Sequence, residues 1–176
     1  LEVLSTYAKV VADKHRIRIP HLDMRTASST LKADASLDWD LLEMKPTSAV
    51  TANLKADIGK QDVALMTGTL LDSTFITHYP DAPLQLRAQM EGDLNHLQLH
   101  NLSAILTDAL DMRSQGELKY LTDSLRRGGE LTLSAIAEDL SFLPAMTGGV
   151  AIPTGTSLQG KALVEGPQMV ADMTLA

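Results

Sequence analysis

Two histidines and two aspartates have the residue types and the spacing that could support chemistry. His96 and His100 are four residues apart, and on a helix this spacing would place two metal ligands on one face. Asp38 and Asp40 flank Trp39, and a pair of carboxylates is what a glycosidase uses for acid and base catalysis. Whether either pair could support this chemistry depends on the secondary structure in which it lies.

The histidine pair lies in a segment where apolar and polar residues alternate. Leu97, Leu99 and Leu102 favour a strand, on which His96 and His100 would point to solvent. We therefore interpret both histidines as residues of a surface strand, and the sequence predicts neither a metal site nor a cofactor.

Catalysis is also the weaker interpretation of Asp38 and Asp40. A glycosidase needs its carboxylates across a cleft, in environments that separate their pKa values. Neighbouring aspartates on one side of a strand are more often solvated. Trp39 could be a platform for a sugar, but its alternation with Leu37 and Leu41 predicts that it lines a core or a groove.

The general composition also disfavours an enzyme. The sequence has no Gly-x-Ser-x-Gly elbow, Walker loop or dinucleotide fingerprint. Among 176 residues there is no cysteine, which excludes disulfides, thiolate metal sites and a cysteine nucleophile. The net charge of −7 argues against nucleic acid as a partner. Hydrophobic residues reach 44% but aromatic residues only 3%, which suits a thin apolar layer of small and aliphatic side chains.

Alternation with a period of two residues dominates the chain and predicts strands. From Leu31 to Leu41, apolar residues at odd positions alternate with polar residues at even positions. One apolar and one charged face per strand is typical of an antiparallel sheet solvated on one side. The residues predicted to line an apolar groove are Leu31, Ala33, Leu37, Leu54, Ile58, Leu84, Leu86, Met90, Leu97, Leu99, Leu110, Met112, Leu131, Leu133, Leu158 and Val164.

Two segments depart from this alternation. In the segment from Leu1 to Ala12 the spacing of Leu4, Ala8 and Val11 could suit a helix, but its valines favour a strand, and we expect a strand or a mixed element. Glu138 to Pro144 resembles a short cap or a single helical turn, which Pro144 would stop.

The sequence also repeats itself, with a period of about 80 residues. Val10 to Ile19 aligns with Met90 to Leu99, and residues 66–68 (Met-Thr-Gly) recur identically at 146–148. Residues 84–92 recur at 158–166, after a shorter interval. We expect a first β-repeat unit over residues 1–80, a second over 81–155 and the start of a third over 156–176. The chain begins without Met and ends inside an alternating segment, so we interpret it as an internal fragment of a longer protein.

Several segments together resemble the TamB branch of the AsmA-like envelope proteins, of the Bacteroidetes type, and the resemblance covers most of the chain. The residues that carry it are the strand-turn-strand from Leu84 to Leu102, Asp111-x-x-Ser-x-Gly116, Leu131-x-Leu-x-Ala135 and Asp139-Leu-Ser-Phe-Leu-Pro144.

The resemblance implies a long β-sheet folded into a groove with an apolar inside, in a parent protein anchored in the inner membrane and spanning the periplasm. It implies phospholipid transport toward the outer membrane. A related role in this family is the assembly of outer-membrane β-barrel proteins beside an Omp85-type partner.

The sequence therefore predicts an all-β fold, an elongated and curved antiparallel sheet of repeats, which is either an open groove or sandwich-like. The predicted function is a conduit for phospholipid, whose acyl chains lie on the apolar face. A scaffold that templates barrel strands through its sheet edges is the first alternative. An adhesin with a closed sandwich or solenoid, which binds carbohydrate or protein, is the second.

Overall fold

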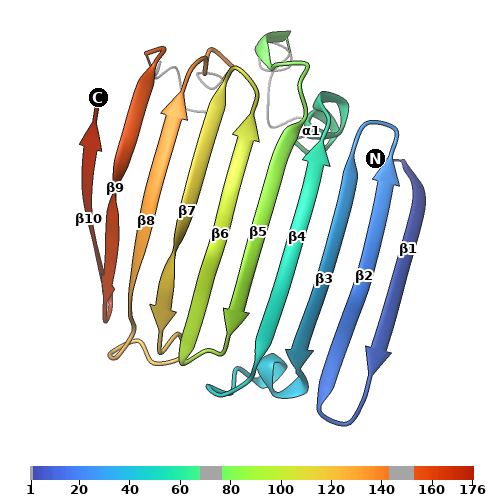
Figure 1. Ribbon diagram of the computed structural model, residues 1–176, viewed down its shortest axis with the longest axis vertical. Coiled ribbons are helices and arrows are strands. Elements are labelled where there is room, and N and C mark those ends of the chain that lie inside the picture. The colour runs from blue at the N-terminus through green and yellow to red at the C-terminus, as the bar shows by residue number, and fades with distance from the viewer. Residues whose placement is uncertain (1, 68–76, 143–152) are drawn as a thin grey trace.

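The computed structural model describes residues 2–67, 77–142 and 153–176. The described strands form one open antiparallel sheet of ten strands, in which neighbours in the chain are also neighbours in the sheet (Figure 1). The prediction of an all-β antiparallel sheet is confirmed. The strands are β1 (Val3–Ala12), β2 (Arg16–Thr26), β3 (Thr30–Asp38), β4 (Val50–Ile58), β5 (Leu84–Gly92), β6 (His96–Leu106), β7 (Leu110–Lys119), β8 (Gly128–Ala137), β9 (Thr156–Glu165) and β10 (Gln168–Leu175).

The pairing register places the apolar residues of all strands on the same face of the sheet. Ala33 of β3 lies opposite Leu54 of β4, and Leu133 of β8 lies between Ser114 of β7 and Gly160 of β9. Paired residues project from the same face of a sheet, so the apolar residues of successive strands gather on one face. A slip of one residue in any pair would move that strand's apolar residues to the other face, which fixes the register.

The sequence repeat has a direct counterpart in the strands. β2 and β6 begin and end 80 residues apart. The pairing of each with its following strand is interrupted at the same place, between Ile19 and Leu22 in β2 and between Leu99 and Leu102 in β6. Such an irregularity inserts an extra residue and bends the strand locally. The two strands therefore share their shape as well as their sequence pattern.

The turns that precede these two strands also match. Oδ1 of Asp13 accepts hydrogen bonds from the backbone N–H groups of His15 and Arg16, at 2.8 and 2.9 Å. Eighty residues later, Oδ1 of Asp93 accepts hydrogen bonds from the backbone N–H groups of Asn95 and His96, both at 2.8 Å. This is the local bonding by which aspartate stabilises a turn. The repeat is thus a four-stranded unit, and units join in one sheet because β4 pairs with β5 and β8 pairs with β9.

The segment from Leu1 to Ala12, which was expected to be a strand or a mixed element, contains the strand β1. By contrast, the strand expected to continue to Leu41 ends at Asp38. A 3-10 helix, η1 (Trp39–Glu43), follows and ends where Met44 adopts a left-handed φ of 56°. Oδ2 of Asp38 accepts the backbone N–H of Ala49 at 3.0 Å, which holds the chain as it turns back toward β4. Alternation alone could not predict this contact, because it joins residues eleven positions apart.

Alternation also gave no indication of α1 (Lys60–Thr67), the helix after β4. Residues 66 and 67 of the repeated Met-Thr-Gly end this helix, whereas Gly68 and the second copy lie outside the described residues. Residues 138–142, expected to form a short cap or a single helical turn, form a bend and a turn and no helix, and residues 143 and 144 again lie outside the described part. Within the described ranges, no helix is long and apolar enough to cross a membrane.

The main buried cluster lies at one end of the apolar face. Its members are Tyr79, Leu106, Ala109, Ala137, Leu140 and Phe142, with Val63 of α1 packed against them. We call this the capped end, the first cap being α1 with Tyr79 and the second cap being residues 138–142. The caps lie where β4, β6 and β8 end, at the top of Figure 1.

Candidate functional site, an open apolar sheet face

The apolar face is the largest candidate site. The strand registers place on it every residue that the sequence analysis predicted to line a groove, and each of these residues is half-buried. Leu97 and Leu131, for example, come from strands two apart in the sheet and point to the same side. The structure therefore brings the predicted residues together on one surface.

Large and small side chains alternate across this face. One row runs across the strands from β3 to β9 through Ala33, Leu54, Ala88, Leu102, Ser114, Leu133 and Gly160. In the adjacent row toward the capped end, large residues stand where the first row has small ones, and small residues where it has large ones. This row runs through Leu31, Ala56, Leu86, Ala104, Met112, Ala135 and Leu158. Each leucine of the first row thus stands among small neighbours, and the surface has pits of side-chain size between its leucines.

No second sheet covers this face in the part of the chain that the structure describes. Leu102 in the middle of the sheet is 41% exposed, whereas a leucine in the core of a sandwich is normally buried. The face is a single open layer away from the caps. The described residues therefore do not form the closed sandwich that was one of the expectations.

Beneath and beside the caps the apolar face deepens into two cavities. One, of about 140 Å³, lies between α1 and the sheet and is lined by residues that include Met24, Ala56 and Met66. The other, of about 700 Å³, lies beside the second cap and is lined by residues that include Leu140 and Leu158. Both linings are mainly apolar, so the capped end adds partly sheltered apolar hollows to an otherwise open face.

A buried carboxylate holds the first cap on the sheet. Asp62 of α1 is 5% exposed, and its Oδ2 accepts hydrogen bonds from the hydroxyls of Thr26 and Ser29. Oγ of Ser29 in turn accepts the backbone N–H of Gly59 at 3.0 Å. Gly59 has to be glycine, because a Cβ there would lie 2.4 Å from the carbonyl oxygen of Ser28. The hydrogen bonds from Ser29 and then Thr26 lower the pKa of Asp62.

This carboxylate predicts a pH dependence of stability. The pKa of Asp62 is lower in the folded chain than the usual value of about 3.9, so its contribution is complete above that value and is lost as the pH falls toward the folded pKa. Asp62→Asn should lower the free energy of unfolding at pH 7 by about 1.5–3 kcal/mol, the usual range for a hydrogen bond to a charged group. Urea unfolding from pH 7 to pH 2.5 should show the difference between variant and wild type shrinking below pH 4. A difference that stays constant would contradict this account.

The opposite face of the sheet is polar and carries the two histidines. Nε2 of His96 lies 2.9 Å from Glu117, and Nε2 of His100 lies 2.9 Å from Glu91. Both histidines are on β6, a surface strand, as predicted. Across the described residues there is no group of three or more side chains arranged to hold a metal ion.

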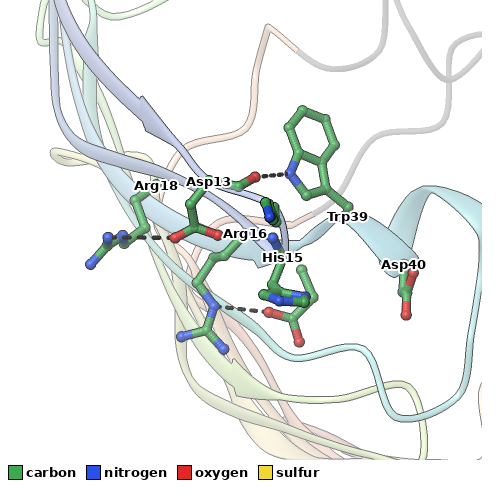
Figure 2. Close-up of a pocket in the computed structure, with 8 residues that line it drawn as sticks. Asp13, His15, Arg16, Arg18, Trp39 and Asp40 are labelled. Carbon is green, nitrogen blue, oxygen red and sulfur yellow. Dashed lines mark hydrogen bonds and ion pairs between the residues drawn. The ribbon is translucent and has the colours of Figure 1, made fainter.

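A polar cleft of about 660 Å³ lies at the end of the sheet opposite the caps (Figure 2). Within it, Nε of Arg16 is 2.8 Å from Asp38, and Asp13 is 3.8 Å from Arg18. The guanidinium of Arg16 lowers the pKa of Asp38, and the pKa of Asp13 is lowered by the N–H groups of its turn. A glycosidase acid needs a raised pKa, which neither Asp13 nor Asp38 has. Asp40, the other aspartate beside Trp39, lies in η1 and forms an ion pair with Lys45 at 2.8 Å.

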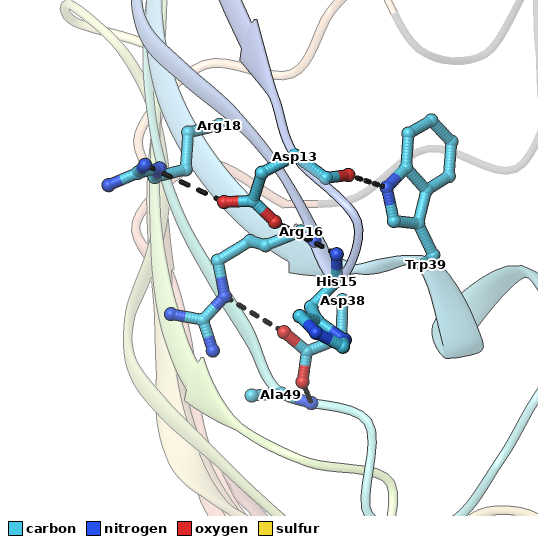
Figure 3. A network of polar contacts seen from close by, with 7 residues as sticks. All are labelled: Asp13, His15, Arg16, Arg18, Asp38, Trp39 and Ala49. Carbon is cyan, nitrogen blue, oxygen red and sulfur yellow. Dashed lines mark hydrogen bonds and ion pairs between the residues drawn. The ribbon is translucent and has the colours of Figure 1, made fainter.

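Trp39 lies at the rim of the same cleft. Its Nε1 donates a hydrogen bond to the backbone oxygen of Asp13 at 2.8 Å, and the ring is 38% exposed. Figure 3 shows the indole turned away from the guanidinium groups of Arg16 and Arg18. The prediction that Trp39 belongs to the strand alternation is therefore wrong, because the strand ends before it. The residue borders the polar cleft and not the apolar face, and its indole fixes the turn.

No protein-family model, curated protein or solved structure matches this chain. The resemblance to TamB-like proteins therefore stays a prediction from the residues. Sequence reasoning missed the first cap, with Asp62 and Tyr79, and it predicted the second only as a short cap or helical turn over residues 138–144, without the packing role of Phe142. A signal for them was available, because Asp62 and Phe142 are themselves 80 residues apart.

Proposed function

We propose that this chain is a segment of a β-groove that spans the periplasm and carries phospholipid between the inner and outer membranes, with the acyl chains on the apolar face. The observation that carries the proposal is the continuity of that face over all ten strands, without a covering layer among the described residues. A lipid on it would remain in contact with apolar side chains while moving from strand to strand.

The free energy of transfer from water favours binding of an acyl chain to this face. Each methylene removed from water gains about 0.8 kcal/mol, and an open face provides apolar contact at every step across the sheet. A strand of ten residues spans about 33 Å, close to the roughly 30 Å of a bilayer's hydrocarbon core. The width of the face along the strands is therefore sufficient for an extended acyl chain.

The cellular setting is part of the same proposal and rests on the resemblance. A parent protein anchored in the inner membrane would place the groove in the periplasm, and an outer-membrane barrel partner would bind through other parts of that parent. No substrate is turned over in this proposal, and the chain acts by presenting a surface.

Native mass spectrometry after incubation with phosphatidylethanolamine vesicles tests the proposal. We expect protein–lipid complexes with whole phospholipid molecules, and competition by free palmitate. Glycerophosphoethanolamine, which has the head group but no acyl chains, should neither bind nor compete. A chain that stays folded and monodisperse but carries no lipid would contradict the proposal.

A scaffold for outer-membrane barrel assembly is a second candidate, which the resemblance implies and which would act through a sheet edge of the parent protein. Exposed edges can template the addition of another strand. Photo-crosslinkers in the edges would then capture barrel proteins, and those on the apolar face would capture no lipid. The adhesin alternative would use the exposed ring of Trp39, and glycan binding that is lost in Trp39→Ala would favour it.

A further inference from the structure

The connection from β7 to β8 carries two neighbouring arginines, Arg126 and Arg127, that have no carboxylate partner among the described residues. Every other arginine of the sequence forms an ion pair with an aspartate. The chain as a whole is acidic, with a net charge of −7. Two adjacent guanidinium groups without an acid are therefore an exception in this molecule, and they could bind an anion from outside the chain.

The repeat shows which acid is absent. In the corresponding connection of the first unit, Nζ of Lys45 lies 2.8 Å from Asp40 and 3.1 Å from Glu43. Eighty residues later, Tyr120 stands in the place of Asp40, and Asp123 stands in the place of Glu43. The first unit thus neutralises the cation of this connection with its own carboxylates, whereas the second unit has exchanged one of the two acids for an aromatic ring.

The remaining acid and the ring hold the shape of the connection. Oδ1 of Asp123 accepts the backbone N–H groups of Leu125 and Arg126, at 3.0 and 3.2 Å. The guanidinium carbon of Arg126 lies 4.3 Å from the centroid of the Tyr120 ring. Such stacking uses the flat face of a guanidinium, so the N–H donors in its plane are left for another acceptor.

The second guanidinium also has donors without an acceptor. A terminal N–H group of Arg127 donates one long hydrogen bond, of 3.5 Å, to the backbone oxygen of Leu121. Its Nε is buried and has no acceptor in the described chain. Because an arginine has five N–H donors, the Arg127 side chain can donate to a further ligand without breaking an ion pair.

Both arginines lie at the end of the sheet opposite the caps, which we call the uncapped end (Figure 1). β8 begins there, and its residue nearest to the connection on the apolar face is Gly129, between Leu118 of β7 and Val164 of β9. Because glycine has no side chain, β8 places nothing between the connection and the apolar face. A ligand that lies on this face along β8 therefore ends at the two arginines.

We propose that Arg126 and Arg127 bind a phosphate group at the uncapped end of the apolar face. The planar donors of arginine match the oxygens of a phosphate in pairs, which makes it the side chain best suited to this group. That the phosphate belongs to a phospholipid, with acyl chains along the strands, rests on the proposed function. Two guanidinium groups favour a head group without a cation of its own, so phosphatidylglycerol should bind more tightly than phosphatidylethanolamine.

Native mass spectrometry with phosphatidylglycerol vesicles tests the site. Arg126→Gln combined with Arg127→Gln should weaken phosphatidylglycerol binding about 25-fold, since one basic residue beside an anionic lipid contributes about a factor of five. Binding of diacylglycerol, which has acyl chains but no phosphate, should not change. Lys32→Gln combined with Lys55→Gln is the matched control, because it removes two facing cations from the polar face and should bind as the wild type does. Circular dichroism checks the fold of each variant.

The outcomes separate this site from the lipid surface. Equal phosphatidylglycerol binding in the arginine variant and the wild type would overturn the phosphate site, while diacylglycerol binding would leave the apolar face intact. Failure of every lipid to bind, diacylglycerol included, would contradict the proposed function instead. Inorganic phosphate then decides the site: at constant ionic strength, millimolar phosphate should shift the amide NMR signals of residues 120–127 in the wild type and not in the arginine variant. Such shifts would assign the site to a free phosphate, and their absence would overturn the proposal.

Discussion

Replacing Leu133 by aspartate should remove at least nine-tenths of the lipid binding while the sheet stays folded. Leu133 is in β8 between Ser114 and Gly160, so its side chain stands above small neighbours on the apolar face. It is half-buried, with no layer of the described chain above it. A carboxylate there can remain hydrated in the empty protein, but a bound acyl chain would have to remove that water, which is costly for a charge.

The next residue along β8 provides the matched control. Ser134 lies on the polar face opposite Arg113, where an added carboxylate meets a positive charge. Ser134→Asp should therefore bind phosphatidylethanolamine as the wild type does, in the same native mass spectrometry experiment. Two results for Leu133→Asp would contradict an open lipid surface: binding equal to that of the wild type, or loss of the fold by circular dichroism, which would indicate a closed core.

The residues of the apolar face could be predicted because two local rules agree. A period of two residues sets which side chains share a face of a strand, and residues paired across neighbouring antiparallel strands project from the same face of the sheet. Leu54 and Leu133 are therefore placed correctly without any knowledge of distant contacts. The same reasoning extended β3 beyond Asp38, because alternation cannot detect the bond from Ala49 that ends the strand.

The helix of the first cap and the contacts of both caps could not be predicted in this way, because they depend on tertiary packing. α1 has only eight residues, and helices of that length are marginal on their own, so Asp62 and the sheet below determine whether it forms. Tyr79 gives no periodic signal, and it becomes part of the core only by packing against Phe142, with ring centroids 5.2 Å apart. Local patterns thus predict the sheet, whereas its end depends on residues far apart in sequence.

The two caps are held on the end of the sheet by different kinds of contact. In the first unit, buried Asp62 and the half-buried Thr26 and Ser29 form a hydrogen-bonded group. The residues 80 positions later are Leu106, Ala109 and Phe142, and all three belong to the apolar cluster. The repeat therefore conserves the place of the cap contact while it exchanges a polar contact for an apolar one. The two caps should respond differently to pH.

Phe142→Ala should accordingly cost about 3–5 kcal/mol of unfolding free energy, the usual loss when a buried phenylalanine is truncated. Phe142 is 6% exposed and packs edge-on against Tyr79, so the variant leaves a cavity beneath the second cap. Phe142→Leu, which keeps most of the apolar volume, is the matched control and should cost clearly less.

Urea unfolding at pH 7 and at pH 2.5 completes the comparison with Asp62→Asn. The loss caused by Phe142→Ala should be the same at both values, because Tyr79, the titratable side chain of the apolar cluster, has a pKa raised by burial above its usual value of 10.0 and stays neutral over this range. The loss caused by Asp62→Asn should be present at pH 7 and much reduced at pH 2.5. A cost below 1 kcal/mol for Phe142→Ala would mean that the second cap does not hold the end of the sheet. Equal pH responses of the two variants would mean that the caps do not differ in chemistry as their side chains indicate.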